Sequence, residues 1–244
     1  MSTVLAPPSA AAPARSRLTA VARVHAQNWQ IAFLWPIGIL AVIAGITWTV
    51  LALVPRGSAE VNTGGASFVF FFGLVLFAQS VNQFFPFVSG LGVTRWEFFR
   101  ATTAVVVIHA LLFGTLMIAL SAVERVTDGF GVGMRLFSLS APVAGSVVTE
   151  FAFFVTVIAL ANTVGVLAGA IYLRWRAVGM WATGLLATLA LGVVVVVFTW
   201  QSWWVPVGTA IADAPRSVTM VLLPLALTAL ATPGVWAVLR RTTV

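Results

Sequence analysis

The sequence predicts an all-α integral membrane protein with six transmembrane helices. Of its 244 residues, 61% are hydrophobic and only 8% are charged, whereas a soluble domain carries about 25% charged residues. The mean hydropathy is +1.07. The few charges form clusters, and the apolar stretches between them are long enough to cross a hydrocarbon core about 30 Å thick. This pattern is typical of a polytopic helical membrane protein.

Six apolar segments have the length of a transmembrane helix. We expect these spans at about residues 31–53, 67–89, 101–123, 146–173, 177–200 and 218–239. Residues 1–16, rich in Ala, Pro and Ser, predict a disordered tail. Residues 17–30 place apolar side chains on one helical face, which predicts an amphipathic helix in the membrane interface; a charged flank with little helix is the alternative. Residues 17–244 then form a single transmembrane domain.

The positions of the arginines predict the orientation of the chain. Nine of the thirteen lie in the N-terminal segment, the second and fourth connections and the C-terminal tail: Arg15, Arg17, Arg23, Arg95, Arg100, Arg174, Arg176, Arg240 and Arg241. The other four, Arg56, Arg125, Arg135 and Arg216, share their connections with acidic residues. Because cytoplasmic connections carry an excess of arginine, we expect both termini in the cytoplasm. The net charge of +7 then faces anionic lipid, and we expect no nucleic acid as partner.

The composition leaves little material for catalysis or metal binding. The chain has no cysteine, two histidines and six acidic residues. Neither paired carboxylates, a nucleophile with its base, nor a metal-ligand spacing occurs. We therefore expect no catalytic, cofactor-binding or metal-binding residues and no enzymatic activity.

The connection between the second and third spans is the most informative segment. Gly90 and Gly92 allow the chain to leave the second span, and Thr94 lies three residues before Glu97. This is the spacing of a capping box, so a new helix should begin near Arg95. That helix would expose Arg95 and Trp96 and suit the docking of a soluble partner. The alternative is a capped start to the third span, with the arginines fixing only the topology.

The run SGLGVTRWEFFRA, residues 89–101, resembles the cytoplasmic connection of type-2 ABC transporter permeases, especially actinobacterial ones. Permeases of this family have an amphipathic helix before span one, six spans, a coupling helix between spans two and three, and short re-entrant helices outside between spans five and six. The resemblance extends from about Arg17 to the end of the chain. It implies a protein of the bacterial plasma membrane.

The resemblance also implies functional residues and partners. The coupling region that contacts the ATP-binding subunit maps to six residues: Gly92, Thr94, Arg95, Trp96, Glu97 and Phe98. Residues 201–217 would form the outer re-entrant element. The chain has no lysine and no G-x-x-x-x-G-K-[ST] loop, so ATP and Mg²⁺ would bind to a separate ABC subunit. A second permease chain, identical or related, would pair through spans one, two and five.

Three amides of the second span form the best polar group within the membrane. Gln79, Asn82 and Gln83 follow an i, i+3, i+4 spacing, which places them on one helical face about 10–16 Å from the cytoplasmic side. They are candidates for the substrate path, and interhelical hydrogen bonding is the alternative.

Other notable residues have simpler interpretations. His109 lies near mid-bilayer and is a packing residue or a proton carrier. Glu150 begins the fourth span on the outer side, where its carboxylate can reach water. Ala161, Gly165 and Gly169, next to Asn162, form a small-residue stripe that favours close helix packing, within the chain or between protomers.

Together these observations predict the transmembrane permease subunit of an ATP-driven exporter with a hydrophobic or amphipathic substrate: a drug, lipid, peptide or glycan. A secondary transporter driven by an ion gradient would need more ionisable groups within the spans. A non-transporting immunity or assembly component is a third interpretation.

Overall fold

The computed structural model describes residues 30–53, 61–62, 64–138 and 140–242. The expected tail at 1–16 and the amphipathic helix at 17–30 lie outside this part, apart from Gln30. The elements, in chain order, are η1 Gln30–Leu34, α2 Trp35–Leu53, β1 Val61–Asn62, α3 Ser67–Gly90, α4 Arg95–Val126, η2 Gly129–Gly133, β2 Met134–Arg135, α5 Ala141–Ala144, α6 Val147–Trp200, α7 Trp204–Asp213, η3 Val218–Leu222 and α8 Leu223–Leu239. The elements η1 and η3 are five-residue π-helical turns, whereas η2 is an irregular turn in which Phe130 and Gly131 have positive φ.

Five helical segments of the described chain are long and apolar enough to cross a membrane. They span Gln30–Leu53, Ser67–Gly90, Arg95–Val126, Val147–Trp200 and Val218–Leu239. The prediction of a helical, membrane-embedded protein is confirmed at this level. The segments expected as separate fourth and fifth spans lie within one helix, α6, which has 54 residues.

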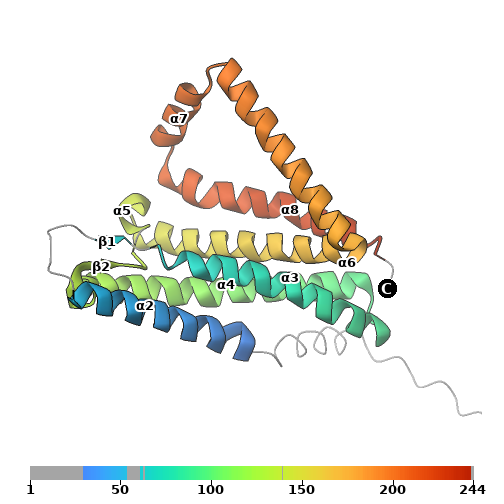
Figure 1. The fold of residues 1–244 in the computed structure, drawn as a ribbon, viewed down its shortest axis with the longest axis horizontal. Coiled ribbons are helices and arrows are strands. Elements are labelled where there is room, and N and C mark those ends of the chain that lie inside the picture. The colour runs from blue at the N-terminus through green and yellow to red at the C-terminus, as the bar shows by residue number, and fades with distance from the viewer. Residues whose placement is uncertain (1–29, 54–60, 63, 139, 243–244) are drawn as a thin grey trace, which may run out of the picture.

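Helix α6 is interrupted at a single residue. Arg176 has φ 55° and ψ −148°, whereas its neighbours on both sides are helical. A positive φ is rare for a residue other than glycine, and here it changes the direction of the helix axis. Figure 1 shows α6 running beside α3 and then turning away from the bundle. The two parts, 147–175 and 177–200, are therefore distinct in direction.

The first part of α6 is the centre of the bundle. It packs against α3, α4 and α8 (Figure 1). On one side of it a buried cluster joins these helices through Phe77, Phe85, Phe98, Val166 and Leu239. A second cluster joins α2, α3, α4 and β2 through Leu40, Val69, Phe113, Met117 and Met134.

Small residues allow α3 and α6 to approach closely. A Cβ atom added to Gly165 would collide with the carbonyl of Leu74, and one added to Gly169 would collide with the carbonyl of Ala78. The third residue of the predicted stripe, Ala161, is partly buried on the same helix. The two glycines thus lie against the backbone of α3 within the chain.

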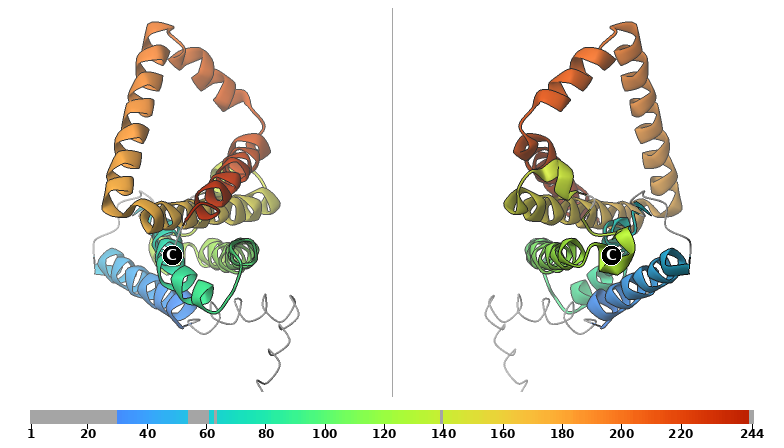
Figure 2. Two further views of the ribbon diagram at one scale, coloured as in Figure 1. Left: turned by 90° about the vertical axis from the view of Figure 1, so that its right-hand side faces the viewer. Right: turned by 90° about the vertical axis from the view of Figure 1, so that its left-hand side faces the viewer.

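The second part of α6 and helix α7 have few neighbours among the described residues. Both stand away from the other helices in the two views of Figure 2. Large apolar side chains here are exposed, including Trp181 at 81% and Trp200 at 79%. A continuous apolar surface of this kind needs lipid or another protein to cover it.

The expected cytoplasmic helix between spans two and three is not a separate element. Four residues, 91–94, connect α3 to α4, and α4 continues unbroken from Arg95 to Val126. The capping box starts the long helix directly, so no second break separates a coupling helix from the third span. Of the six predicted coupling residues, Gly92 and Thr94 therefore lie in the connection. The other four, Arg95, Trp96, Glu97 and Phe98, form the first turn of α4.

Candidate functional site: the start of α4 and a cavity beside it

The first turn of α4 is fixed by reciprocal hydrogen bonds. The Thr94 hydroxyl accepts from the amide of Glu97 at 3.2 Å, while the Glu97 carboxylate accepts from the Thr94 amide at 2.8 Å. The hydroxyl also donates to the carboxylate at 2.8 Å. Gly92 has φ +79°, a backbone conformation in which a residue with a side chain would be strained. These contacts stabilise a sharp turn from α3 into α4.

This turn also contacts the C-terminal end of the bundle. Arg95 donates from Nη1 to the carbonyl of Arg240 at 2.8 Å. The Trp96 ring lies edge-on to that of Trp236, with centroids 4.9 Å apart, and stacks on Phe99 at 5.5 Å. The first turn of α4 and the end of α8 thus form one surface.

The six predicted coupling residues divide by exposure. Phe98 is buried and lies edge-on to Phe85 at 5.1 Å between ring centroids. Arg95 is exposed, and Trp96 is 49% exposed even with Trp236 against it. Arg100, Arg240 and Arg241 are also exposed. The result is a basic and aromatic surface, built from Arg95, Trp96, Arg100, Arg240 and Arg241, on a base anchored by Phe98.

A cavity of about 400 Å³ lies between η1, α3 and α4. Gln79, Ser80 and Gln83 line it from α3, and His109 lines it from α4. The rest of the wall is apolar: Ile31, Ala32, Phe33, Leu76, Phe77, Phe84, Val105, Ile108 and Leu112. This size and lining suit a small organic ligand.

Asn82 does not share this cavity. Its Nδ2 donates to the carbonyl of Ala78 at 3.0 Å, one turn earlier in α3. Of the three amides predicted on one face, the structure therefore brings Gln79 and Gln83 together at the cavity and places Asn82 outside its lining.

His109 and Asn162 form a buried pair between α4 and α6. The Asn162 Nδ2 lies 3.1 Å from His109 Nδ1, and the two residues are 0% and 3% exposed, respectively. Three phenylalanine rings surround the imidazole, with Phe113 stacked at 4.5 Å between centroids. A Cβ added to Gly73 would collide with Asn162 Oδ1, so α3 closes over the pair.

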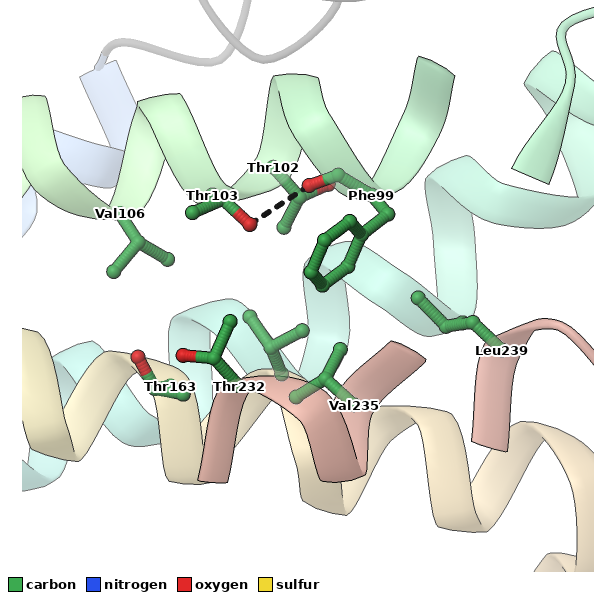
Figure 3. A pocket seen from close by; sticks show the side chains of 9 residues that line it. Phe99, Thr102, Thr103, Val106, Thr163, Thr232, Val235 and Leu239 are labelled. Carbon is green, nitrogen blue, oxygen red and sulfur yellow. Dashed lines mark hydrogen bonds between the residues drawn. The ribbon is translucent and has the colours of Figure 1, made fainter. Parts of the chain in front are cut away.

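A second, much smaller cavity lies between α4, α6 and α8. Its volume is about 20 Å³, which is room for about one water molecule. Figure 3 shows hydroxyls of Thr102, Thr103, Thr163 and Thr232 around it, with Thr103 donating to the carbonyl of Phe99 at 2.9 Å. The Thr102 hydroxyl is buried without a hydrogen-bond partner among the described residues. The cavity is too small for an organic ligand.

At the opposite end of α4, the buried carboxylate of Glu124 binds the backbone of residues 136–138. Glu124 accepts from the amides of Leu136 and Phe137 at 2.8 Å and from that of Ser138 at 3.0 Å, and also from the Ser138 hydroxyl. Nearby, β1 and β2 pair in parallel, Val61 with Met134.

Glu150 contradicts the expectation that its carboxylate reaches water. It is 1% exposed, forms an ion pair with Arg125 at 2.6 Å and accepts from the Ser121 hydroxyl at 2.7 Å. Pairing rather than solvent compensates its charge. Sequence reasoning missed this site. The signals available were Glu124 beside Arg125 at the end of the third expected span and Glu150 near the start of the fourth.

Within the described residues, no three His, Asp or Glu side chains gather as a metal-binding group. Comparison with family models, curated proteins and solved structures finds no match for this chain. The fold and the site therefore define the chain as a helical, membrane-embedded protein. Its function must be inferred from the geometry above and from the resemblance of residues 89–101.

Proposed function

We propose that the chain is the transmembrane permease subunit of an ATP-binding-cassette exporter. One observation carries the proposal: a rigidly capped first turn of α4 that presents Arg95 and Trp96 on a basic, aromatic surface. A capping box satisfies two backbone donors at the start of a helix and so stabilises that turn. Exposed tryptophan and arginine are also the side chains that contribute most to protein interfaces.

The proposed topology has six spans with both termini in the cytoplasm of a bacterial plasma membrane. A straight 54-residue helix would be about 80 Å long, far more than the hydrocarbon core of about 30 Å. The break at Arg176 divides α6 into two segments that can each span the bilayer. Arg174 and Arg176 at the break, together with Arg95, Arg100, Arg240 and Arg241, then lie on the cytoplasmic side.

Energy would come from a separate subunit that binds ATP and Mg²⁺. Closure of its ATP-bound dimer favours one arrangement of the spans over the other, which is a shift in population between two states. The first turn of α4 would transmit this bias, since it continues without a break into a membrane helix and contacts α8. A second permease chain, identical or related, would complete the transporter. The exposed second part of α6 offers it an apolar surface.

The cavity between η1, α3 and α4 would belong to the substrate path. Its apolar wall and the amides of Gln79 and Gln83 suit a hydrophobic or amphipathic substrate of the drug, lipid, peptide or glycan classes. Glutamines within a membrane are costly unless they meet a polar group or water. The chain itself would perform no chemistry.

Affinity purification from the native membrane in mild detergent tests the proposal. The wild-type chain should co-purify with a protein that contains a Walker-type ATP-binding loop. The double variant Arg95→Glu/Trp96→Ala should lose it, while Arg216→Glu/Trp204→Ala, which changes exposed residues of the same types near α7, should retain it. Gel filtration of each variant verifies folding. If wild type retains no ATP-binding protein even after chemical crosslinking, the proposal is wrong.

A further inference from the structure

The 400 Å³ cavity between η1, α3 and α4 is lined by two exposed amide groups. Gln79 and Gln83 lie on its α3 side, and both residues are exposed. They are one helical turn apart, which is about 6 Å along the helix axis. Val75 and Phe87, the exposed residues before and after them on the same face of α3, are apolar. A molecule that enters the cavity can therefore contact both amides within an apolar surface.

These amides are available to a ligand, whereas the other polar side chains of the wall are engaged. Within the described part of the chain, neither glutamine side chain makes a hydrogen bond. Ser80 is buried and donates to the carbonyl of Leu76 at 2.8 Å, and His109 is buried against Asn162. An amide that faces a membrane interior is costly unless it meets a polar group. A ligand that satisfies Gln79 and Gln83 would remove this cost.

The rest of the wall restricts the ligand to a largely apolar, neutral molecule. No arginine, aspartate or glutamate lines the cavity among the described residues, so a charged ligand would lose its hydration without gaining a counter-charge. A glycan carries more hydroxyls than two amides can pair. A pure hydrocarbon chain pairs neither amide. The wall therefore fits an apolar body with one or two polar groups.

The chemistry of glutamine selects among these polar groups. A carboxamide donates through its NH₂ group and accepts through its carbonyl oxygen. An ester or ether oxygen only accepts, so it leaves the glutamine carbonyls without a donor. A secondary amide carries one donor and one acceptor on neighbouring atoms. It can donate to one glutamine while it accepts from the other.

We propose that this cavity binds a neutral, lipid-soluble molecule through a secondary amide, held between the side chains of Gln79 and Gln83. The apolar body of the ligand packs on Leu76, Ile108 and Leu112 of the wall. Acylated amines and hydrophobic peptides have this chemistry. As a binding site the inference stands alone; as a statement about the exported substrate it rests on the proposed function.

Three photoreactive probes test the site in the purified full chain, reconstituted in lipid nanodiscs without any ATPase. They are diazirine-bearing alkyl chains of equal length whose central group is a secondary amide, an ester or a pair of methylenes. Mass spectrometry measures labelling of Leu76 and Leu112 relative to residues 181–196, which are exposed on the second part of α6. This ratio corrects for the different concentrations of the probes in the bilayer.

The amide probe should give a ratio about ten-fold above that of the hydrocarbon probe, with the ester probe between them. Equal ratios for the three probes would mean that the amides meet only water or lipid, and would overturn the proposal. An ester probe that labels as strongly as the amide probe would overturn the choice of a secondary amide.

Matched variants assign the preference to the two glutamines. Gln79→Leu/Gln83→Leu should lose the preference for the amide probe, and each single variant should reduce it. Gln201→Leu, which changes an exposed glutamine outside the cavity, should retain it. Gel filtration verifies folding, and if the double variant does not fold, the single variants decide. A preference that survives unchanged without either glutamine contradicts the site.

The outcome is independent of the exporter proposal. Amide-selective labelling with no ATP-binding partner would leave a ligand site in a protein of another function. Co-purification of an ATPase without selective labelling would contradict only the assignment of this cavity.

Discussion

Arg125, near the end of α4, and Glu150, in the first turn of α6, form an ion pair with Nη1 2.6 Å from Oε2. The carboxylate is 1% exposed, whereas the guanidinium side chain is 30% exposed. Ser121 donates a further hydrogen bond to the same carboxylate at 2.7 Å. The pair fixes the ends of two neighbouring helices to each other on the side opposite the start of α4.

Removal of the arginine should destabilise the protein more than removal of the pair. Arg125→Met leaves a buried carboxylate without its counter-charge, and we expect a loss of about 3 kcal/mol. Arg125→Met/Glu150→Met should recover part of this loss, because apolar side chains replace both charges. Thermal unfolding in detergent measures the effect, with the exposed Arg216→Met as control. A single variant as stable as the control would contradict this role.

Glu124 should be sensitive to the loss of its charge even when its size is kept. Glu124→Gln replaces one carboxylate oxygen with an NH₂ group that faces amide donors of Leu136, Phe137 or Ser138. We expect a cost of about 3 kcal/mol and faster proteolysis within residues 129–140. Asp128→Asn, at an exposed residue with φ 50°, is the matched control because asparagine tolerates this conformation. Equal protease resistance of the two variants would show that Glu124 does not hold the segment.

The two classes of glycine in α6 should respond in opposite directions to the same substitution. Gly165→Ala places a Cβ against the carbonyl of Leu74, and we expect a loss of about 2 kcal/mol. Gly184→Ala adds its Cβ to open space and should be neutral or stabilise the helix by up to about 1 kcal/mol. The melting temperatures of the two variants in one detergent test this. A drop for Gly184→Ala as large as that for Gly165→Ala would contradict intrachain packing as the cause.

The absence of cysteine allows a direct test of the six-span topology. Single cysteines at Asp213 and Arg241, both exposed, should behave differently toward a membrane-impermeant maleimide applied to intact cells. The cysteine at 213 should react, and that at 241 should react only after the membrane is opened. Reaction at both positions in intact cells would mean that Val218–Leu239 does not cross the membrane between them, and protection of the cysteine at 213 would mean that the break at Arg176 does not separate two spans.

Local patterns in the sequence predict the start of α4 well and its continuation poorly. The capping box involves residues three apart, so Thr94 and Glu97 suffice to place it. Whether the helix ends again before the third span depends on packing of Phe98 against Phe85, which no local signal encodes. The contact between Arg95 and Arg240 joins residues 145 apart and is equally invisible in the sequence.

The candidate site shows the same contrast between features with a local sequence signal and features that depend on long-range contacts. A helical period brings Gln79 and Gln83 to one face, but it does not reveal that the shorter side chain of Asn82 bonds to its own helix. Glu124 binds amides 12 to 14 residues away in a segment where Asp128, Gly129, Phe130 and Gly131 have positive φ. The path of such a segment follows from tertiary contacts rather than from periodicity. The sequence alone could therefore indicate the acids and not their partners.

The most direct measurement of the central claim is site-specific photocrosslinking from residue 96 in living cells. A benzophenone amino acid in place of Trp96 should capture one protein with a Walker-type ATP-binding loop, because the first turn of α4 contacts it. The same amino acid in place of Trp181, an exposed tryptophan on the second part of α6, should capture no ATP-binding protein, and a second permease chain is the partner expected there. An adduct with the ATP-binding protein from position 96 alone is the predicted result. The absence of that adduct, or equal capture from both positions, would contradict the account.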